Sequence, residues 1–186
     1  MKTGWFKVNG TDYYASTSGE IKAQWVGSGN TWYYVDADGK MLTGYQTISG
    51  AKYYFAESGL MQTGWFKING EDYYAASSGA IQAQWVKSLS NWYYVDVDGK
   101  MVTGYQTING AKYYFASSGL MQKGWFKING EDYYAASSGT IQAQWVKSGR
   151  NWYYVDTDGK MVTGDYIIDR KVNYFDNQGL WMNKIN

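Results

Sequence analysis

The strongest constraint on the fold of this chain is a repeat. Trp5, Trp65 and Trp125 each follow a glycine and begin the same run, Trp-Phe-Lys-(Val/Ile)-Asn-Gly, at a spacing of 60 residues. A shorter period of 20 residues lies within it and is marked by the aromatic pairs Tyr13-Tyr14, Tyr33-Tyr34, Tyr53-Tyr54, Tyr73-Tyr74, Tyr93-Tyr94, Tyr113-Tyr114, Tyr133-Tyr134 and Tyr153-Tyr154. Such periods are typical of repeat arrays, in which each unit buries its apolar face against its neighbours. We therefore expect a repeat protein rather than an irregular globular enzyme.

Nine units of 20 residues cover residues 4–183, and three types of unit alternate along the chain. A-type units are 4–23, 64–83 and 124–143; B-type units are 24–43, 84–103 and 144–163; C-type units are 44–63, 104–123 and 164–183. The last unit departs from its type at Asp165, Asn173 and Trp181. Because terminal repeats are often atypical, we interpret it as a divergent cap. Residues 1–186 are treated as a single repeat domain.

Each unit is predicted to form a β-hairpin. In the second A-type unit, residues 65–68 form an aromatic and β-branched run, Asn69-Gly70 supplies a tight turn, and residues 72–75 form the return strand. The turn Ser88-Leu89-Ser90 lacks glycine, so we expect that hairpin to be the least regular.

The hairpins are expected to stack, because an isolated hairpin is marginally stable in water. With three alternating types, about three hairpins would complete one superhelical turn, and units of one type would share a ridge. The sequence therefore predicts an all-β fold, a β-solenoid of nine stacked hairpins of about 20 residues each.

Composition excludes several classes of site. The chain has no Cys and no His, which removes disulfides, zinc sites with His or Cys ligands, and His-based catalytic triads. The net charge is +1, with 17 basic and 16 acidic residues interspersed, so we expect no nucleic-acid binding. No apolar run is long enough for a membrane span, so we expect no membrane insertion. No secretory signal follows Met1, so we interpret the chain as a C-terminal module of a larger secreted protein, with export by another route as the alternative.

The residue pattern of the units resembles the cell-wall-binding repeats, also called choline-binding repeats, of pneumococcal surface proteins and of bacterial and phage lysins. The pattern runs from Gln144-Trp145 through Trp152-Tyr153-Tyr154 to Gly159-Lys160-Met161, and similar runs cover nearly the whole chain. Related aromatic repeats occur in glucan-binding domains and clostridial toxin tails. The resemblance implies a left-handed solenoid that binds the choline groups of teichoic acids in aromatic cages between successive hairpins.

The resemblance also implies which residues bind the ligand. A family cage takes two Trp from one hairpin and an aromatic residue from the next, with a Met at its edge; only the B-type units have both Trp. The first candidate cage would contain Trp25, Trp32, Tyr45, Tyr53 and Met61, and the second would contain Trp85, Trp92, Tyr105, Tyr113 and Met121. In the third, Trp145 and Trp152 would depend on Trp181 as a substitute, since Asp165 and Asn173 replace the aromatic residues.

Such a cage suits a quaternary ammonium group, because that cation donates no hydrogen bonds and is held by ring faces and apolar contact. Elsewhere the second Trp position is occupied by Asp12, Asp72 and Asp132 or by Lys52 and Lys112. A Lys there could fill the aromatic slot with its own ammonium group. The alternative is that the Trp side chains form stacking core, which we favour for Trp5, Trp65 and Trp125.

The acidic motifs are interpreted as structural. Asp36-x-Asp38-Gly39 and its two equivalents lack the glycine and glutamate positions of a calcium loop and are expected to form turns. In Glu71-Asp72, adjacent strand residues point to opposite faces, so the pair cannot flank one bond as glycosidase carboxylates do. We expect Asp72 to pair with Lys52 of the preceding hairpin. We predict no catalytic residues, no metal and no cofactor.

The leading hypothesis is a non-catalytic module on the bacterial cell surface that recognises choline-containing teichoic acids or another cell-wall polysaccharide. One alternative is a carbohydrate-binding module for a glucan or host glycan, with Gln24, Gln84, Asn91 or Asn151 as polar partners. Another is a structural spacer or adhesin repeat without a ligand. A homodimer through the terminal hairpins is a further expectation.

Overall fold

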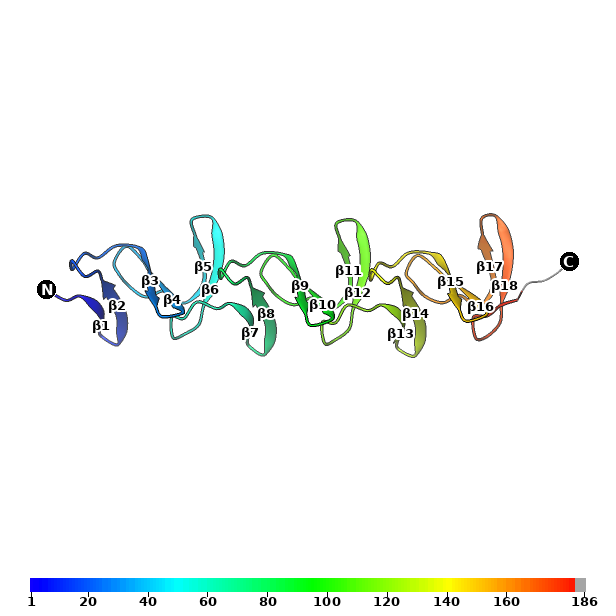
Figure 1. Cartoon of the computed structure of the whole chain (residues 1–186), viewed down its shortest axis with the longest axis horizontal. Coiled ribbons are helices and arrows are strands. Elements are labelled where there is room, and N and C mark those ends of the chain that lie inside the picture. The colour runs from blue at the N-terminus through cyan, green and yellow to red at the C-terminus, as the bar shows by residue number, and fades with distance from the viewer. Residues whose placement is uncertain (183–186) are drawn as a thin grey trace. The chain divides into compact units, whose positions relative to one another are not determined.

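The computed structural model describes residues 1–182, and every regular element within them is a β-strand (Figure 1). The chain divides into two compact units: unit 1 comprises residues 1–85 and 94–101, and unit 2 comprises residues 86–93 and 102–186. Residue 183 of the predicted last repeat, and residues 183–186 of the predicted domain, lie outside the described residues.

The strands follow the 20-residue period. Unit 1 contains β1 (Gly4–Val8), β2 (Thr11–Ala15), β3 (Gln24–Ser28), β4 (Thr31–Val35), β5 (Gly44–Ile48), β6 (Ala51–Phe55), β7 (Gly64–Ile68) and β8 (Glu71–Ala75). The boundary between the units passes through β9 (Gln84–Ser88) and β10 (Asn91–Val95). Unit 2 contains β11 (Gly104–Ile108), β12 (Ala111–Phe115), β13 (Gly124–Ile128), β14 (Glu131–Ala135), β15 (Gln144–Ser148), β16 (Asn151–Val155), β17 (Gly164–Ile168), β18 (Lys171–Phe175) and β19 (Trp181–Met182).

Two-residue turns close the hairpins, as the sequence predicted. β7 and β8 pair antiparallel from Gly64 opposite Ala75 to Ile68 opposite Glu71. Between them Asn69 and Gly70 have φ values of 51° and 85°, and positive φ at both positions matches the twist of the paired strands.

The turn between β9 and β10 differs from its equivalents only locally. Leu89 has a φ of 56°, where the other B-type turns have Gly29 and Gly149 with φ values of 60° and 61°. A branched side chain rarely adopts this backbone region. Both strands are five residues long, like those of the other hairpins, so the expected irregularity is confined to the backbone at Leu89.

The core follows the three unit types. The last residue of each return strand is at most 1% exposed, and its size depends on the type: Ala15, Ala75 and Ala135 in A-type units, Val35, Val95 and Val155 in B-type units, and Phe55, Phe115 and Phe175 in C-type units. Their removal from water supplies the apolar burial that a single hairpin lacks.

Backbone hydrogen bonds connect successive hairpins within each unit. The segment that follows a hairpin bonds to the return strand of the preceding hairpin. In unit 1, the amides of Met41, Met61 and Ile81 donate to the carbonyl oxygens of Asp12, Trp32 and Lys52 at 2.9, 2.8 and 2.8 Å. These bonds satisfy backbone groups that a two-stranded ribbon leaves open at its edge. Unit 1 and unit 2 are therefore each a segment of a β-solenoid, as expected. The left-handed sense of the coil stays a prediction.

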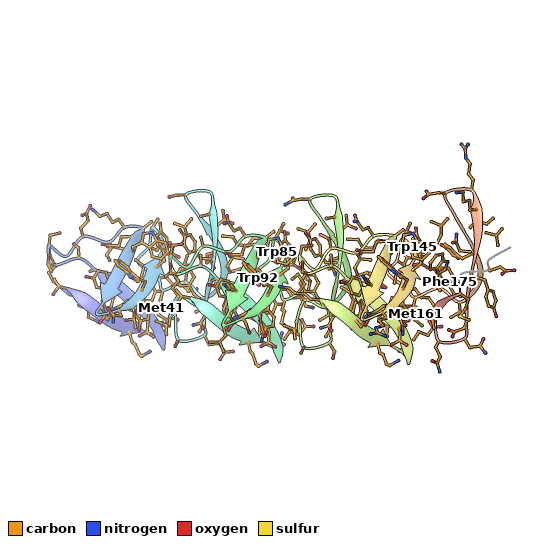
Figure 2. All side chains as sticks on the ribbon, turned by 45° about the vertical axis from the view of Figure 1, so that its right-hand side comes forward. Met41, Trp85, Trp92, Trp145, Met161 and Phe175 are labelled. Carbon is orange, nitrogen blue, oxygen red and sulfur yellow. The ribbon has the colours of Figure 1, made fainter. Side chains whose placement is uncertain are left out.

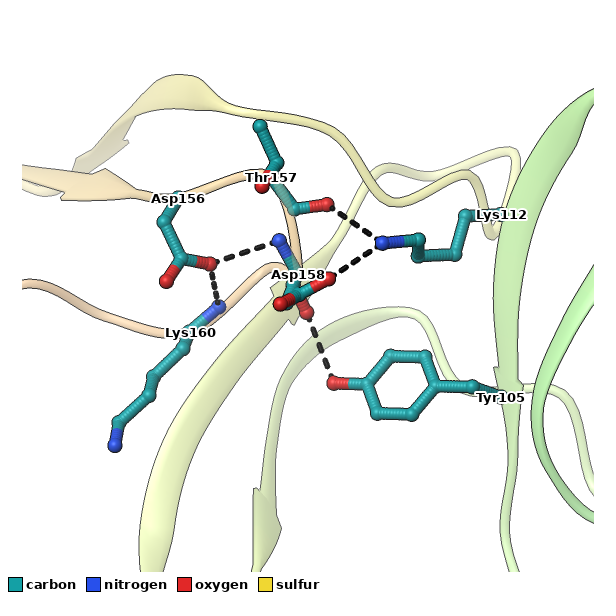
Figure 3. A network of polar contacts seen from close by, with 6 residues as sticks. All are labelled: Tyr105, Lys112, Asp156, Thr157, Asp158 and Lys160. Atoms are coloured by element: carbon teal, nitrogen blue, oxygen red, sulfur yellow. Dashed lines mark hydrogen bonds and ion pairs between the residues drawn. The ribbon is translucent and has the colours of Figure 1, made fainter.

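The Asp-x-Asp-Gly segments form turns, which confirms their structural interpretation. In unit 2, a side-chain oxygen of Asp156 accepts hydrogen bonds from the amides of Asp158 and Lys160 at 2.8 and 3.0 Å (Figure 3). Asp36 and Asp96 make the same bonds in unit 1. Within residues 1–182, no cluster of three or more acidic side chains has the geometry of a metal site.

The last hairpin of unit 2 has an added strand. β18 pairs with β17 on one edge and with β19 on the other, where Phe175 lies opposite Trp181. In earlier C-type units the equivalent contacts are single bridges, from Phe55 to Met61 and from Phe115 to Met121. Trp181 therefore occupies the backbone position of those Met residues. Residues 1–182 contain no helix that is long and apolar enough to cross a membrane.

Candidate functional site

Strand alternation places the two Trp of a B-type hairpin on one face. In β3 and β4, Trp25 lies opposite Tyr34 and Gly27 lies opposite Trp32. Because residues two apart on a strand share a face, the side chains of Trp25 and Trp32 project from the same surface. Their ring centroids are 6.4 Å apart and their planes are inclined by 84°. Val26 faces the other way and is buried, so the hairpin is apolar on both faces.

A hollow lies against this surface in unit 1, and we call it the first hollow. It has a volume of about 440 Å³ and is lined by Trp25, Trp32, Tyr53, Met61, Ser77 and Ser78. Tyr53 comes from β6 of the next hairpin, and its ring centroid is 5.0 Å from that of Trp25 at an angle of 71°. Met61 is fixed by its backbone bond to Trp32. Three rings and a thioether thus surround one space.

The first hollow is open to solvent. Trp25 is 36% exposed and Trp32 is 45% exposed, so neither ring is sealed in a core. The rim also includes a turn of the following A-type hairpin, which supplies the hydroxyl groups of Ser77 and Ser78. That turn was not predicted as part of the site. It packs closely on the cage, because a Cβ added at Gly79 would lie 2.4 Å from the sulfur of Met61.

A second open hollow lies in unit 2, and we call it the last hollow. It has a volume of about 330 Å³ and is lined by Trp145, Trp152 and Trp181. The centroids of Trp145 and Trp152 are 6.4 Å apart with planes inclined by 85°, nearly the same arrangement as in the first hollow. Trp145 also lies 5.8 Å from the buried ring of Phe175, which supports it from below (Figure 2).

The third wall of the last hollow is Trp181, although no aromatic residue stands at the position of Tyr53. The Trp181 centroid lies 5.4 Å from Trp145 at an angle of 75°, close to the contact that Tyr53 makes with Trp25. Asn173 stands at the Tyr53 position in the repeat and accepts a hydrogen bond from Trp181 Nε1 at 3.1 Å. Relative to the first hollow, the last hollow has Asn173 in place of Tyr53 and Trp181 in place of Met61, and the two differences together keep an aromatic third wall.

The residues of the second predicted cage belong to both units. Trp85 lies in unit 1, whereas Trp92, Tyr113 and Met121 lie in unit 2. In unit 1 the ring of Trp85 packs edge-on against Tyr94 at 5.1 Å. In unit 2 Met121 is buried and donates its amide to the carbonyl oxygen of Trp92 at 2.9 Å. This cage stays a prediction.

Tyr45 does not line the first hollow for which it was predicted, and the role of Tyr105 in the second cage stays a prediction. Tyr45 is not among the residues that line the first hollow; its ring packs edge-on against Tyr54 at 5.0 Å, and its hydroxyl donates to the carbonyl oxygen of Asp98 at 3.0 Å. Tyr105 donates in the same way to the carbonyl oxygen of Asp158 at 2.9 Å (Figure 3). Burial, followed by the charge of nearby groups, raises the pKa of Tyr45 to about 12 and raises the pKa of Tyr105 as well.

Lys52 closes the C-type position that corresponds to Trp32. Its ammonium group forms an ion pair with Asp98 and lies 6.0 Å from the ring centroid of Tyr45. The ammonium group of Lys52 thus lies near an aromatic ring, whereas its replacement of a ligand in a slot stays a prediction. The expected pair between Lys52 and Asp72 is wrong: Asp72 instead pairs with Lys67 of its own hairpin at 2.6 Å. Lys67 lies directly opposite Asp72 in the strand register, which makes it the nearer partner.

A-type hairpins carry one Trp and a carboxylate at this face. Trp5 contacts Tyr14 at 5.2 Å and Tyr33 of the next hairpin at 5.3 Å. At the position of Trp32 stands Asp12, whose carboxylate is paired with Lys7 at 2.7 Å. This face has only one indole ring and a neutralised ion pair, so it lacks the two-indole wall of the hollows.

Other polar groups do not converge on the hollows. The Nε2 atom of Gln24 is buried without a protein partner, but Gln24 adjoins Trp25 on the strand and therefore points to the opposite face. The carboxylates of Glu71 and Asp72 each have a lysine partner, Lys100 and Lys67 respectively. The hydrogen bond from Lys100 to Glu71 raises the pKa of Lys100. These contacts support stacking and offer no pair of carboxylates around one space.

Comparison with known proteins places these features in a family. The family described as choline-binding repeat matches residues 42–85 and 102–144, and the one described as putative cell wall binding repeat matches residues 3–21, 24–41, 84–101 and 144–161. Among curated protein sequences, none matches the chain.

Solved structures give the same result. The choline-binding domain of CbpL from Streptococcus pneumoniae is 31% identical, with a TM-score of 0.70 and coverage of 98% of each chain. CbpJ from Streptococcus pneumoniae TIGR4 is 27% identical, with a TM-score of 0.82 and coverage of 97% of this chain and 71% of that chain. Choline binding protein F from the same species is 22% identical, with a TM-score of 0.70 and coverage of 97% and 87%, and supports the fold alone. The repeats, the hairpin fold and these matches agree: the chain belongs to the choline-binding repeat family.

Proposed function

We propose that this chain is a non-catalytic module that binds choline groups of teichoic acids in the bacterial cell wall. The observation that carries the proposal is the pair of open hollows, each walled by three aromatic rings, of which two are indoles in the first hollow and all three are indoles in the last. A trimethylammonium group fits such a space because its charge is attracted by ring faces and its methyl groups by apolar contact. Family membership supports the same ligand.

Several hollows on one chain suit a polymeric ligand. A single aromatic cage holds a cation weakly, at roughly 0.5–2 kcal/mol per ring face. A polymer that displays many choline groups can occupy more than one hollow, and the second contact then benefits from a high effective concentration. We therefore propose that the module acts outside the bacterial cell, on the wall. The proposed partner is thus a choline-decorated wall polymer, and the proposed homodimer through terminal hairpins would add further hollows to one particle.

Retention on a choline or tertiary-amine resin tests the proposal. The whole chain is expected to bind the resin and to elute with free choline, whereas dextran at the same concentration should leave it bound. Passage through the resin without retention would contradict choline recognition. Elution by dextran but not by choline would instead support the carbohydrate-binding alternative. A choline-dependent rise of the melting temperature is expected in parallel, because a ligand bound only by the native state stabilises it.

A further inference from the structure

The two hollows differ at the residue that lies opposite the second Trp. In the first hollow this residue is Gly27, opposite Trp32, and in the last hollow it is Lys147, opposite Trp152. The ring of Trp32 rests on the glycine, since a Cβ there would lie 3.1 Å from a ring carbon. In the last hollow the ammonium group of Lys147 lies 5.5 Å from the centroid of the Trp152 ring. The same aromatic wall is therefore uncharged in one hollow and carries a cation in the other.

Within residues 1–182, no acidic group forms an ion pair with Lys147. Lysines in the equivalent position of A-type hairpins, such as Lys7 and Lys127, pair with the Asp directly opposite them. Opposite Lys147 stands an indole ring instead, and among the ion pairs of residues 1–182 none includes Lys147. A free ammonium group thus stands beside a hollow that is itself proposed to receive a cation.

This arrangement disfavours a ligand that carries only positive charge. Two like charges near one ring repel each other, and both compete for the same ring face. A ligand whose ammonium group is followed by a phosphate ester behaves differently. Its phosphate can approach the ammonium group of Lys147 while its methyl groups enter the cage, so the repulsion is offset by a charge-assisted contact. The first hollow presents only serine hydroxyl groups at its rim, from Ser77 and Ser78.

We propose that Lys147 makes the last hollow selective for phosphocholine esters over free choline, whereas the first hollow recognises the ammonium group alone. This inference rests on the proposed function, because it assumes that both hollows receive a quaternary ammonium group. It assigns Lys147 as a specificity residue. Lys147 contacts the part of the ligand that links choline to its polymer, and the selection acts on the phosphate ester rather than on the cation.

Site-resolved titration of the whole chain tests the inference. In NMR spectra of the uniformly labelled protein, the indole N–H signals of Trp25 and Trp32 report on the first hollow, and those of Trp152 and Trp181 report on the last. The ligands are choline, phosphocholine and glycerophosphocholine. At the last hollow both esters are expected to bind about two- to fivefold more tightly than choline, the range of an exposed ion pair. At the first hollow the ratio should be about one, as expected without a charged partner.

Reciprocal substitutions isolate the lysine. Lys147→Gln should bring the ratio at the last hollow to about one, and Gly27→Lys should raise the ratio at the first hollow about two- to fivefold. Gly27 does not have positive φ, so a lysine is compatible with its backbone. Lys123→Gln, in the segment before β13, removes the same charge elsewhere and should leave both ratios unchanged. The preference should shrink at 1 M salt, where charges are screened over about 3 Å.

The outcomes are distinct. A preference for both esters supports the inference and points to the phosphodiester of a wall polymer, whereas a preference for phosphocholine alone supports it with the free monoester as the ligand. Equal binding of choline and both esters at the last hollow, or a preference that survives Lys147→Gln, would overturn the inference. Failure of choline to bind at either hollow would overturn the proposed function instead. If Lys147→Gln does not fold, Gly27→Lys still decides the question.

Discussion

Two neighbouring interfaces of unit 1 share a backbone arrangement but differ in chemistry. Trp32 in β4 and Lys52 in β6 occupy the same position of successive hairpins, and the carbonyl oxygen of each accepts a hydrogen bond from the next linker at 2.8 Å. At Trp32 the indole leaves an open hollow beside it. At Lys52 the side chain places its own ammonium group near Tyr45 and pairs it with Asp98.

Under the proposed function, we infer that the side chain at this position of each hairpin decides whether an interface receives a cation. The solenoid requires backbone bonds between successive hairpins, together with the buried Ala, Val or Phe at the end of each return strand. The position opposite Gly27, Thr47 or Lys7 is free to vary, because its side chain points out of the core. An indole there builds a wall, a lysine supplies an internal cation, and an aspartate forms an ion pair.

Removal of an indole wall should have the largest effect. Trp32→Ala deletes one ring face and opens the first hollow, so choline affinity there is expected to fall about 10- to 30-fold, as for the loss of up to 2 kcal/mol. Site-resolved titration through Trp25 measures the change. Asp12→Ala is the matched control, because Asp12 has the same position in an A-type hairpin; it should leave the first hollow unchanged. Equal losses in both variants would contradict the assignment of the wall.

The last hollow offers a non-additive test. Asn173→Tyr and Trp181→Met each restore half of the arrangement found around Tyr53 and Met61. Either single change is expected to lower choline affinity about three- to tenfold, because it crowds or removes the third wall. The double variant should recover most of the affinity, since it rebuilds the first type of cage. Additive losses, measured by calorimetric titration, would show that Trp181 and Asn173 do not act as a pair.

Replacement of Lys52 by Trp should add a choline-binding site at the interface that Lys52 occupies. Lys52→Trp removes the internal ammonium group and supplies a second ring, so one more choline-binding site is expected, with an affinity within about tenfold of the first hollow. Lys52→Ala is the control: it also breaks the ion pair with Asp98, at a cost of about 0–1 kcal/mol, but adds no wall. The number of sites per chain, from calorimetric titration, distinguishes the two variants. An unchanged number of choline-binding sites in Lys52→Trp would show that this position does not decide whether an interface binds choline.

Substitution of Tyr45 is expected to have the smallest effect, a pH-dependent change in the free energy of unfolding. The hydroxyl of Tyr45 donates to Asp98, and burial raises its pKa to about 12. Because the folded pKa lies above the unfolded value of about 10, this group stabilises the fold fully below pH 10, and the contribution is lost as pH rises towards 12. Tyr45→Phe should therefore lower the free energy of unfolding by about 1 kcal/mol at pH 7, with a smaller difference at pH 11. Urea unfolding at both pH values measures it; a difference that grows with pH would contradict the account.

The local parts of the structure were predictable from the sequence. Asn69-Gly70 specifies a turn that any strand pair must respect, and Asp156 satisfies amides two and four residues ahead. Both features depend on residues close together in the chain. The pairing of Trp25 with Trp32 and Tyr53 followed from the period together with the family pattern.

The remaining contacts depend on the exact placement of one hairpin against the next, and the three alternating unit types give only an approximate rotation per hairpin. Tyr45 reaches Asp98, 53 residues away, rather than the first hollow. Ser77 reaches the rim from a hairpin beyond the predicted pair. Trp181 lines the last hollow because β19 extends the sheet and Asn173 accepts a hydrogen bond from its indole. The sequence shows that both residues depart from the repeat, but not that they contact each other.

The most direct test of the central claim is the response of individual Trp side chains to choline. In a titration followed by indole N–H signals of the whole chain, the signals of Trp25, Trp32, Trp145, Trp152 and Trp181 are expected to shift and to reach saturation with choline. Trp5 and Trp125 should stay unshifted, because Asp12 and Asp132 replace the second indole beside them. Uniform shifts of all these signals, or no saturation at any of them, would contradict recognition of choline by indole-walled hollows.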